Sequence, residues 1–155
     1  MDDSFESRDK ECQLDSCLFF TAAKLARELG RMADEAFSKT GLSPSHAMVL
    51  YLVNHRGGIQ QKELGETLHL TPSTITRLLE KLERKELVSK TTNGKNATLC
   101  TTQKGLSLQE EIITSWNTLR GGYNEILTEE ETARFIEISC KLLKKSDNNS
   151  GGRNL

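Results

Sequence analysis

The stretch from Gln60 to Thr101 restricts the fold of this chain more than any other part (QQKELGETLHLTPSTITRLLEKLERKELVSKTTNGKNATLCT). It predicts a short helix from Ile59 to Leu68, a turn at His69-Leu70, a second helix, and a β-hairpin. The second helix has a clear start, because Thr71-Pro72 places a capping oxygen directly before a proline at the first helical position. We expect it to continue to about Lys85.

The second helix has one apolar stripe and one polar face. The stripe follows the i, i+3, i+4, i+7 spacing of a buried helix face and consists of Ile75, Leu78, Leu79 and Leu82. The polar face begins with the hydroxyls of Ser73 and Thr74 and continues with the cations Arg77 and Lys81. Such groups can contact base edges and phosphates in a major groove. On its own, this helix equally fits the common case of an amphipathic helix with a solvated face.

The elements after this helix favour the DNA interpretation. Two runs rich in Val and Thr, Leu87 to Thr92 and Ala97 to Thr101, flank Asn93-Gly94-Lys95-Asn96, and Asn-Gly between two such runs is a strong hairpin signal. Helix, turn, helix and hairpin in this order predict a winged helix-turn-helix, in which the hairpin (the wing) reaches neighbouring phosphates or the minor groove. Lys90 and Lys95 would supply the cations of the wing, and Asn96 would donate to a phosphate or base edge.

The distribution of charge agrees with a local nucleic-acid surface. The whole chain has a formal net charge of −1, which argues against a protein that coats nucleic acid indiscriminately. Residues 60–105 nevertheless carry eight cations and five acids. No apolar run approaches the roughly 18 residues of a membrane span, and the N-terminus is acidic and unlike a secretory signal. We therefore expect a cytoplasmic protein with reduced cysteines.

Long helices are expected on both sides of the winged segment. The first runs from Gln13 to Phe37, with an apolar 4-3-4-3-4 seam like that of paired helices. Ser43-Pro44 starts a second, largely apolar helix that ends at residues 55–58. A third runs from Gln103 to Leu127, with Ile112, Trp116, Leu119, Tyr123 and Ile126 in a similar seam. Gly121-Gly122 is expected to bend or loosen it.

A capping box, with Thr128 at the cap and Glu131 three residues later, predicts the start of a last helix that ends at Lys145. This helix is expected to bury its large apolar side chains, which are Phe135, Ile136, Ile138, Leu142 and Leu143. Residues 1–11 and 146–155 are polar and are expected to be flexible tails.

Several of these segments resemble the multiple-antibiotic-resistance regulator (MarR) family of bacterial transcription factors. The resemblance rests on LSPSHAMVL at 42–50, GIQQKELGETLHLTPSTITRLLEKLERKELV at 58–88, and TQKG at 102–105, and it extends over about residues 14–143. It implies a single mainly α domain with a small β-hairpin wing, in which residues 43–101 form the DNA-binding lobe. Residues 13–40 and 102–145 would then form the dimerisation helices of an obligate homodimer on a pseudo-palindromic promoter site.

Residue roles follow from the matching positions. Ser73, Thr74, Thr76 and Arg77 would contact bases and phosphates, and Lys95 would be the wing tip. The wing departs from the family pattern, which usually carries an acidic residue and arginines where this chain has Gly94-Lys95-Asn96-Ala97. Lysine is more strongly hydrated than arginine and is the poorer minor-groove residue. We therefore expect a weaker wing contact.

The resemblance also implies two modes of regulation. Many family members bind small phenolic ligands between the dimer helices and the lobe, and others sense oxidants through a cysteine. Cys17 loosely resembles the cysteine of the organic-peroxide sensors, although the alignment is one residue out of phase; the alternative is a small buried hydrophobe. Trp116 is expected in the core, with a ligand pocket as the alternative. Cys100 and Cys140 are expected in the core.

Other classes of function lack supporting motifs. No cofactor is expected, the histidines and cysteines are not at metal-ligand spacing, and no phosphate loop or nucleophile-base-acid set suggests an enzyme. The sequence predicts a sequence-specific DNA-binding regulator, a dimeric repressor released by a small ligand. The alternatives are a redox-sensing regulator that uses Cys17 and a winged-helix dimer that acts through protein partners.

Overall fold

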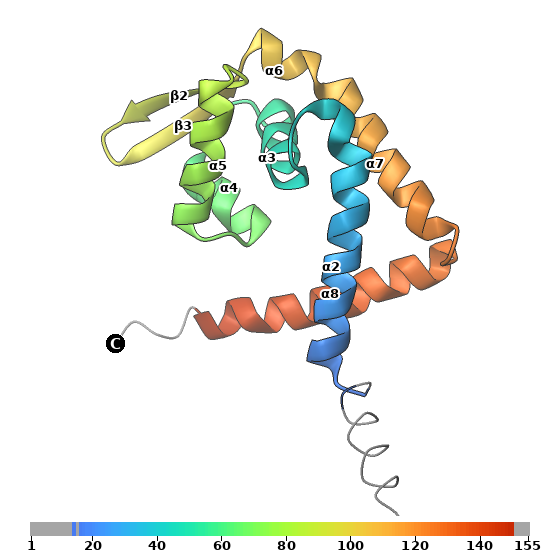
Figure 1. The fold of residues 1–155 in the computed structure, drawn as a ribbon. Coiled ribbons are helices and arrows are strands. Elements are labelled where there is room, and N and C mark those ends of the chain that lie inside the picture. Colours follow the sequence, from blue (N-terminus) through green and yellow to red (C-terminus); the bar gives the residue numbers. More distant parts are fainter. Residues whose placement is uncertain (1–13, 15, 151–155) are drawn as a thin grey trace, which may run out of the picture. The chain divides into compact units, whose positions relative to one another are not determined.

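The computed structural model describes residue 14 and residues 16–150, with side chains described up to Lys144 (Figure 1). The chain divides into two compact units after Trp116. The predicted class is confirmed: helices dominate, and the single sheet of the described residues is small and antiparallel. No helix in the described part of the chain is both long and apolar enough to cross a membrane.

The first unit contains the winged segment. Its elements in chain order are α2 (Leu18–Phe37), the 3-10 turn η1 (Ser38–Thr40), α3 (Pro44–His55), β1 (Ile59–Gln60), α4 (Gln61–Leu68), α5 (Pro72–Arg84), β2 (Val88–Asn93), β3 (Asn96–Thr101), α6 (Gln103–Ser107) and the first half of α7 (Gln109–Asn124). The second unit holds the rest of α7 and α8 (Glu129–Ser150).

The core of the first unit is built from one apolar face of each of its elements. Ile75, Leu79 and Leu82 of α5 are at most 1% exposed, whereas Leu78 is only half-buried. They share this core with fully buried side chains of neighbouring elements, which are Val49, Leu50, Val53, Leu64, Leu99 and Ile112. The predicted stripe of α5 is therefore confirmed at three of its four positions.

The sheet has one strand more than predicted. Ile59 and Gln60, expected at the start of a helix, form β1 and pair with Leu99 and Thr98 of β3. Ile59 is β-branched and only 3% exposed, which suits a strand better than a helix start. The strand order is β1-β3-β2, so β3 is the central strand, and β1 joins the base of the wing to the lobe.

The helices outside the lobe differ from their predicted bounds. α2 begins at Leu18, with Cys17 as its N-cap, and Gln13 lies outside the described residues. The helix predicted over 103–127 is divided at Leu108 into α6 and α7. α7 continues through Gly121-Gly122 and ends at Asn124.

α8 begins as predicted and ends later. Thr128 N–H donates to the Glu131 carboxylate (2.9 Å) and Glu131 N–H donates to Thr128 Oγ1 (3.2 Å), which confirms the capping box. α8 continues to Ser150 instead of Lys145, because no glycine or proline occurs before Gly151. The tail expected at 146–155 is therefore helical over its first five residues, and residues 1–11 and 151–155 lie outside the described part.

The apolar side chains of α8 are not buried within one chain. Phe135, Ile136, Ile138, Leu142 and Leu143 are 47–55% exposed, which contradicts the expected burial. Leu18 (68%) and Phe19 (79%) at the start of α2 are still more exposed. The second unit has too few elements to cover its own apolar face, so these side chains need a partner outside the single chain.

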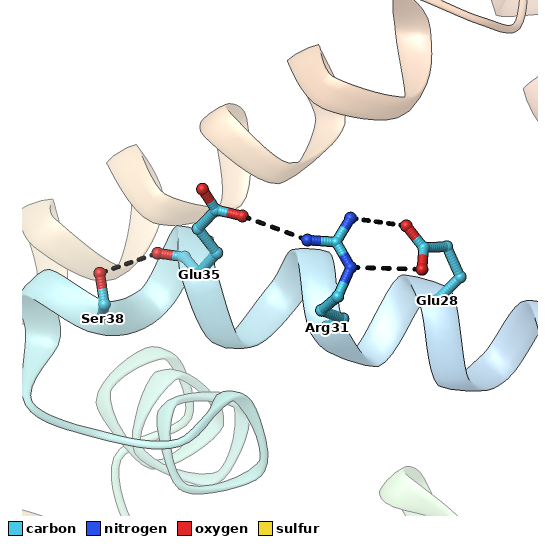
Figure 2. Close-up of polar contacts among 4 residues, drawn as sticks. All are labelled: Glu28, Arg31, Glu35 and Ser38. Atoms are coloured by element: carbon cyan, nitrogen blue, oxygen red, sulfur yellow. Dashed lines mark hydrogen bonds and ion pairs between the residues drawn. The ribbon is translucent and has the colours of Figure 1, made fainter.

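Three charged side chains form ion pairs along the exposed surface of α2. Figure 2 shows the Arg31 guanidinium between Glu28, to which it makes two hydrogen bonds (2.6 and 3.2 Å), and Glu35 at 3.6 Å. The pKa of Glu28 lies below its usual value because Arg31 donates hydrogen bonds to its carboxylate and adds a favourable charge. These pairs are exposed and belong to the i, i+3 and i, i+4 class that stabilises helices modestly.

Candidate nucleic-acid interface

The turn between α4 and α5 sets the position of the recognition helix. His69 caps α4 in the left-handed region (φ 52°), and Leu70 N–H donates to Gly65 O (3.0 Å), as in a Schellman cap. A Cβ on Gly65 would lie only 3.3 Å from Leu70 O and 3.5 Å from Ile75. The predicted turn at His69-Leu70 is confirmed, and Gly65 allows the chain to approach α5 closely.

The first turn of α5 presents a group of hydroxyls. Thr71 Oγ1 accepts from Thr74 N–H (3.4 Å) and lies 2.9 Å from Thr74 Oγ1 and 3.3 Å from Ser73 Oγ. Ser73 is exposed and Thr74 is half-buried. Two of the predicted DNA-contacting residues are therefore at the N-terminal end of α5, which is the end that a recognition helix usually presents to base edges.

Thr76, the third predicted hydroxyl, has a different environment. Its Oγ1 donates to Pro72 O (2.9 Å) and accepts from Nε2 of Gln61 (3.1 Å), so the side chain connects α5 to α4. Gln61 was not singled out in the sequence, because nothing in the helical periodicity distinguishes it from the adjacent Gln60.

The predicted cations all lie on the surface. Arg77 and Lys81 of α5 and Lys90 and Lys95 of the wing are exposed. Among the ion pairs of the described residues, none involves any of these four side chains. A cation without a carboxylate partner keeps its full charge for a phosphate.

The wing carries its polar residues on two paired strands. Asn93 pairs with Asn96, so each strand extends one residue further into the predicted turn 93–96, and Gly94 and Lys95 are its central residues. Only Gly94 has positive φ (61°), which is the pattern of a type II′ turn. Lys95 and Asn96 are both exposed there, and Lys90 is on β2, across from Leu99 of β3.

The base of the wing is fixed to the lobe. Thr102 Oγ1 contacts the carbonyl oxygens of Glu86 (2.7 Å) and Leu87 (3.1 Å) and accepts from Gly105 N–H, which caps α6. Asn54 Nδ2 of α3 donates to Gly105 O (3.0 Å) and to Gln109 Oε1 (2.9 Å). These bonds connect α3, α6 and α7 with residues 86–87, which lead into β2.

The N-terminus of α3 adds a titratable group next to α5. His46 Nδ1 lies 2.5 Å from Ser43 Oγ, the capping oxygen of α3. Burial and the nearby charges of Lys81 and Lys85 hold the pKa of His46 below its usual 6.5. The charge of Lys81, one of the predicted DNA contacts, therefore acts on His46 in the first turn of α3.

The predicted effector residues are in separate places in the first unit. Trp116 is half-buried and packs edge-to-face on Phe37 and Tyr51, with ring centroids 6.0 and 5.3 Å apart. Tyr51 in turn stacks on His55, with ring centroids 5.8 Å apart. Cys17 is half-buried at the start of α2. Cys100 is half-buried, and Cys140 is exposed on α8, so the expectation of a core position for Cys140 was wrong. Within the described residues, no three His, Cys, Asp or Glu side chains could hold a metal.

Comparisons with known proteins give one consistent result. The model of the MarR family matches residues 42–97. The HTH-type transcriptional repressor MdtR of Bacillus subtilis is 28% identical over 116 residues, which cover 73% of this chain and 75% of MdtR. The HTH-type transcriptional regulator MhqR of the same organism is 27% identical over 131 residues, covering 83% and 88%.

Solved structures share the fold. Repressor CouR from Rhodococcus jostii RHA1, bound to p-coumaroyl-CoA, superposes with a TM-score of 0.75 at 22% identity over 83% of this chain and 93% of CouR. MepR of S. aureus in complex with DNA superposes with a TM-score of 0.73 at 19% identity over 83% and 98%. Family model, relatives and winged-helix architecture agree: residues 42–97 match the MarR family, and most of the chain is similar to HTH-type transcriptional regulators.

Proposed function

We propose that this protein is a homodimeric repressor that binds a pseudo-palindromic promoter sequence through α5 and the wing, and that a small ligand releases it. The observation that carries the proposal is the exposed face of α5, where a turn of hydroxyls is followed by cations that have no ion-pair partner in the described residues. A face of this kind matches major-groove base edges and the phosphates beside them. A regulator of promoter DNA is expected in the cytoplasm, and we propose no enzymatic activity or cofactor for it.

The side chains of the interface would have separate tasks. Arg77 is the candidate for bidentate contact with a guanine or a phosphate, because its guanidinium carries a rigid fork of donors. Ser73 and Thr74 would contact base edges or phosphates at the helix start. Lys81, like Lys90, Lys95 and Asn96 of the wing, would contact the DNA backbone, where single cations give affinity without sequence preference.

A homodimer explains the apolar surface outside the lobe. The exposed side chains of α8 and of the start of α2 are large and aliphatic or aromatic, and a second copy of the chain would cover them. Two lobes related by a twofold axis would place their α5 helices in successive major grooves, roughly 34 Å apart. The helices around the lobe, 13–40 and 102–145, would then form the dimerisation region.

The aromatic cluster of Phe37, Tyr51 and Trp116, whose rings pack edge-to-face, is our candidate for the effector site, because sites for planar aromatic ligands are lined mainly by aromatic side chains. A ligand there would act by preferring one spacing of the two α5 helices over another. Oxidation of Cys17 remains the alternative input, and recognition of a protein partner remains the alternative to DNA. Titration with p-coumarate, monitored by the fluorescence of the single tryptophan, tests the site directly. An unchanged emission at millimolar p-coumarate would count against this cluster.

The decisive test of DNA binding removes the charge of Arg77. An operator selected from random DNA should bind Arg77→Ala about 1–3 kcal/mol more weakly than the unmodified protein, roughly fivefold to a hundredfold in Kd. Arg31→Ala is the matched control, because it removes the same side chain from an exposed pair on α2 (Figure 2). Equal anisotropy titrations for the protein and Arg77→Ala would contradict the major-groove model.

The dependence on salt separates DNA from a protein partner. Phosphate contacts release counterions, so log Kd should rise steeply with log salt concentration, and each lost cation should lower that slope by about one. Lys81→Ala should show this smaller slope. A flat response to salt would favour the protein-partner alternative.

A further inference from the structure

The hydroxyl of Thr76 is occupied within the lobe. Its proton is donated to Pro72 O, one turn earlier in α5, and its oxygen also accepts from the amide of Gln61 in α4. Thr76 is half-buried, beside the exposed residues that would meet DNA. A base acceptor could take the Thr76 proton only by breaking a hydrogen bond that already exists.

The side chain of Thr76 also has little freedom to turn. A β-branched residue in a helix has few accessible rotamers, and hydrogen bonding to the i−4 carbonyl selects one of them. The bond from Gln61 adds a second restraint from a neighbouring helix. With the hydroxyl restrained, the other group that Thr76 can bring to a base is its methyl.

Ser73 and Thr74 provide a contrast on the same helix. Their hydroxyls each contact the hydroxyl of Thr71 at the exposed helix start. A hydroxyl rotor in such a group can redirect its proton toward DNA at small cost. The hydrogen-bonding and apolar contributions to recognition are therefore divided between the first and the second turn of α5.

We propose that Thr76 reads the C5-methyl of a thymine through its own methyl group, and that Gln61 is a positioning residue that keeps the Thr76 hydroxyl away from the groove. The inference deepens the proposed function and rests on it. Threonine methyls are suited to this contact, because the thymine methyl is the apolar feature that the major groove displays at an A·T pair. Burying one such group is worth about a fourfold change in affinity.

The experiment combines two variants, Thr76→Val and Thr76→Ser, with the removal of single methyl groups from the DNA. Each thymine of a selected operator is replaced in turn by deoxyuridine, which lacks only the C5-methyl. We expect a loss of about fourfold at one position in each half-site for the unmodified protein. Thr76→Val should keep this sensitivity, with Kd within about twofold. Thr76→Ser removes the contact in both half-sites, so it should bind about sixteenfold more weakly and be insensitive to deoxyuridine at that position.

Two further variants make the result unambiguous. Thr76→Val deprives the Gln61 amide of its acceptor, so the double variant Gln61→Leu/Thr76→Val is measured beside it to separate DNA readout from an unpaired amide. Gln61→Ala tests the positioning role, because the ratio of affinities for thymine and deoxyuridine operators should fall from about four toward one. A merely structural role would weaken both affinities equally and leave the ratio unchanged.

The opposite pattern would overturn the inference. If Thr76→Ser matches the unmodified protein while both valine variants lose affinity, the hydroxyl is the reading group. If no thymine position responds to deoxyuridine, no thymine methyl is read. An unmodified protein that shows no preference for the selected operator over random DNA would overturn the proposed function itself.

Discussion

Among single residues, Gly105 is the one whose side chain the fold excludes most strongly. A Cβ at this position would lie 2.0 Å from Leu87 O and 3.2 Å from Leu50 Cδ1. Its N–H is capped by Thr102 and its carbonyl accepts from Asn54, so the backbone is held from both sides. The glycine is needed here for space, because its φ does not lie in the left-handed region.

Gly105→Ala should lower the free energy of unfolding by about 1–3 kcal/mol, the usual cost of forcing atoms into a packed site. Urea denaturation followed by circular dichroism measures this. Gly121→Ala is the control, because its Cβ meets nothing within 4 Å and it lies inside α7. That control should raise stability by about 0.5–1 kcal/mol. Equal stabilities of the two variants would show that the close approach to Leu87 is not maintained.

His46 should make stability depend on pH. Its folded pKa lies below 6.5, so below that pH the unfolded chain binds more protons than the folded chain. The contribution of neutral His46 is complete above pH 6.5 and is lost as pH falls through 6.5 toward the folded pKa. Urea unfolding between pH 8 and 5 should show a decline that is smaller in His46→Gln. An identical decline in the variant would assign it to other groups.

The sequence could predict residues whose role is local, and it missed those whose role depends on distant partners. The caps at Ser43, Thr71, Thr102 and Thr128 follow from the residues themselves, and all four accept the expected backbone N–H. Asn54 and Gln61 bond to residues 15 to 55 positions away. No pattern of local spacing reports such a contact.

At the scale of elements, the order of the winged segment was predictable and several ends were not. Strong starts such as Thr71-Pro72 placed α5 correctly. β1 has only two residues, and its strand pairing depends on β3, about 40 positions later in the chain. The wing turn lies within the predicted residues 93–96, and each strand extends one residue further into it than predicted, because the register of β2 with β3 pairs Asn93 with Asn96.

The wing should gain affinity from a single substitution at its tip. Lys95→Arg should lower Kd for a selected operator severalfold if the tip enters a minor groove, because arginine loses its hydration more readily than lysine. Lys95→Ala should raise Kd and reduce the salt slope by about two, one for each subunit of the proposed dimer. Fluorescence anisotropy at several salt concentrations gives both quantities. An equal Kd with lysine, arginine or alanine at position 95 would show that the wing tip does not contact the DNA.

For the whole molecule, the apolar surface of α8 is the feature that one chain cannot explain. Sequence periodicity identified these side chains as ones that need burial, and in the single chain they are 47–55% exposed. A pattern of apolar spacing states that a face requires a partner, but it carries no information about which chain supplies it.

Phe135→Asp should weaken the proposed dimer by about 3 kcal/mol or more, because a carboxylate would be buried without a partner. Sedimentation velocity at several concentrations measures the shift toward monomer. Arg134→Ala is the control, since it removes only an exposed ion pair with Glu137 (2.9 Å) on the same turn of α8. Unchanged sedimentation of Phe135→Asp would place the interface elsewhere.

The wing is anchored at its base and free at its tip, and this has a consequence for engineering. β1 pairs with β3 only at Leu99 and Thr98. Thr102 and Gly105, which follow β3, lie against Leu87, which precedes β2. Residues 92–97 lie beyond these anchors and contribute no buried side chain. The tip is therefore the part of the lobe whose length and sequence can be exchanged while the fold is retained, and libraries at these six positions would vary the DNA contact independently of stability.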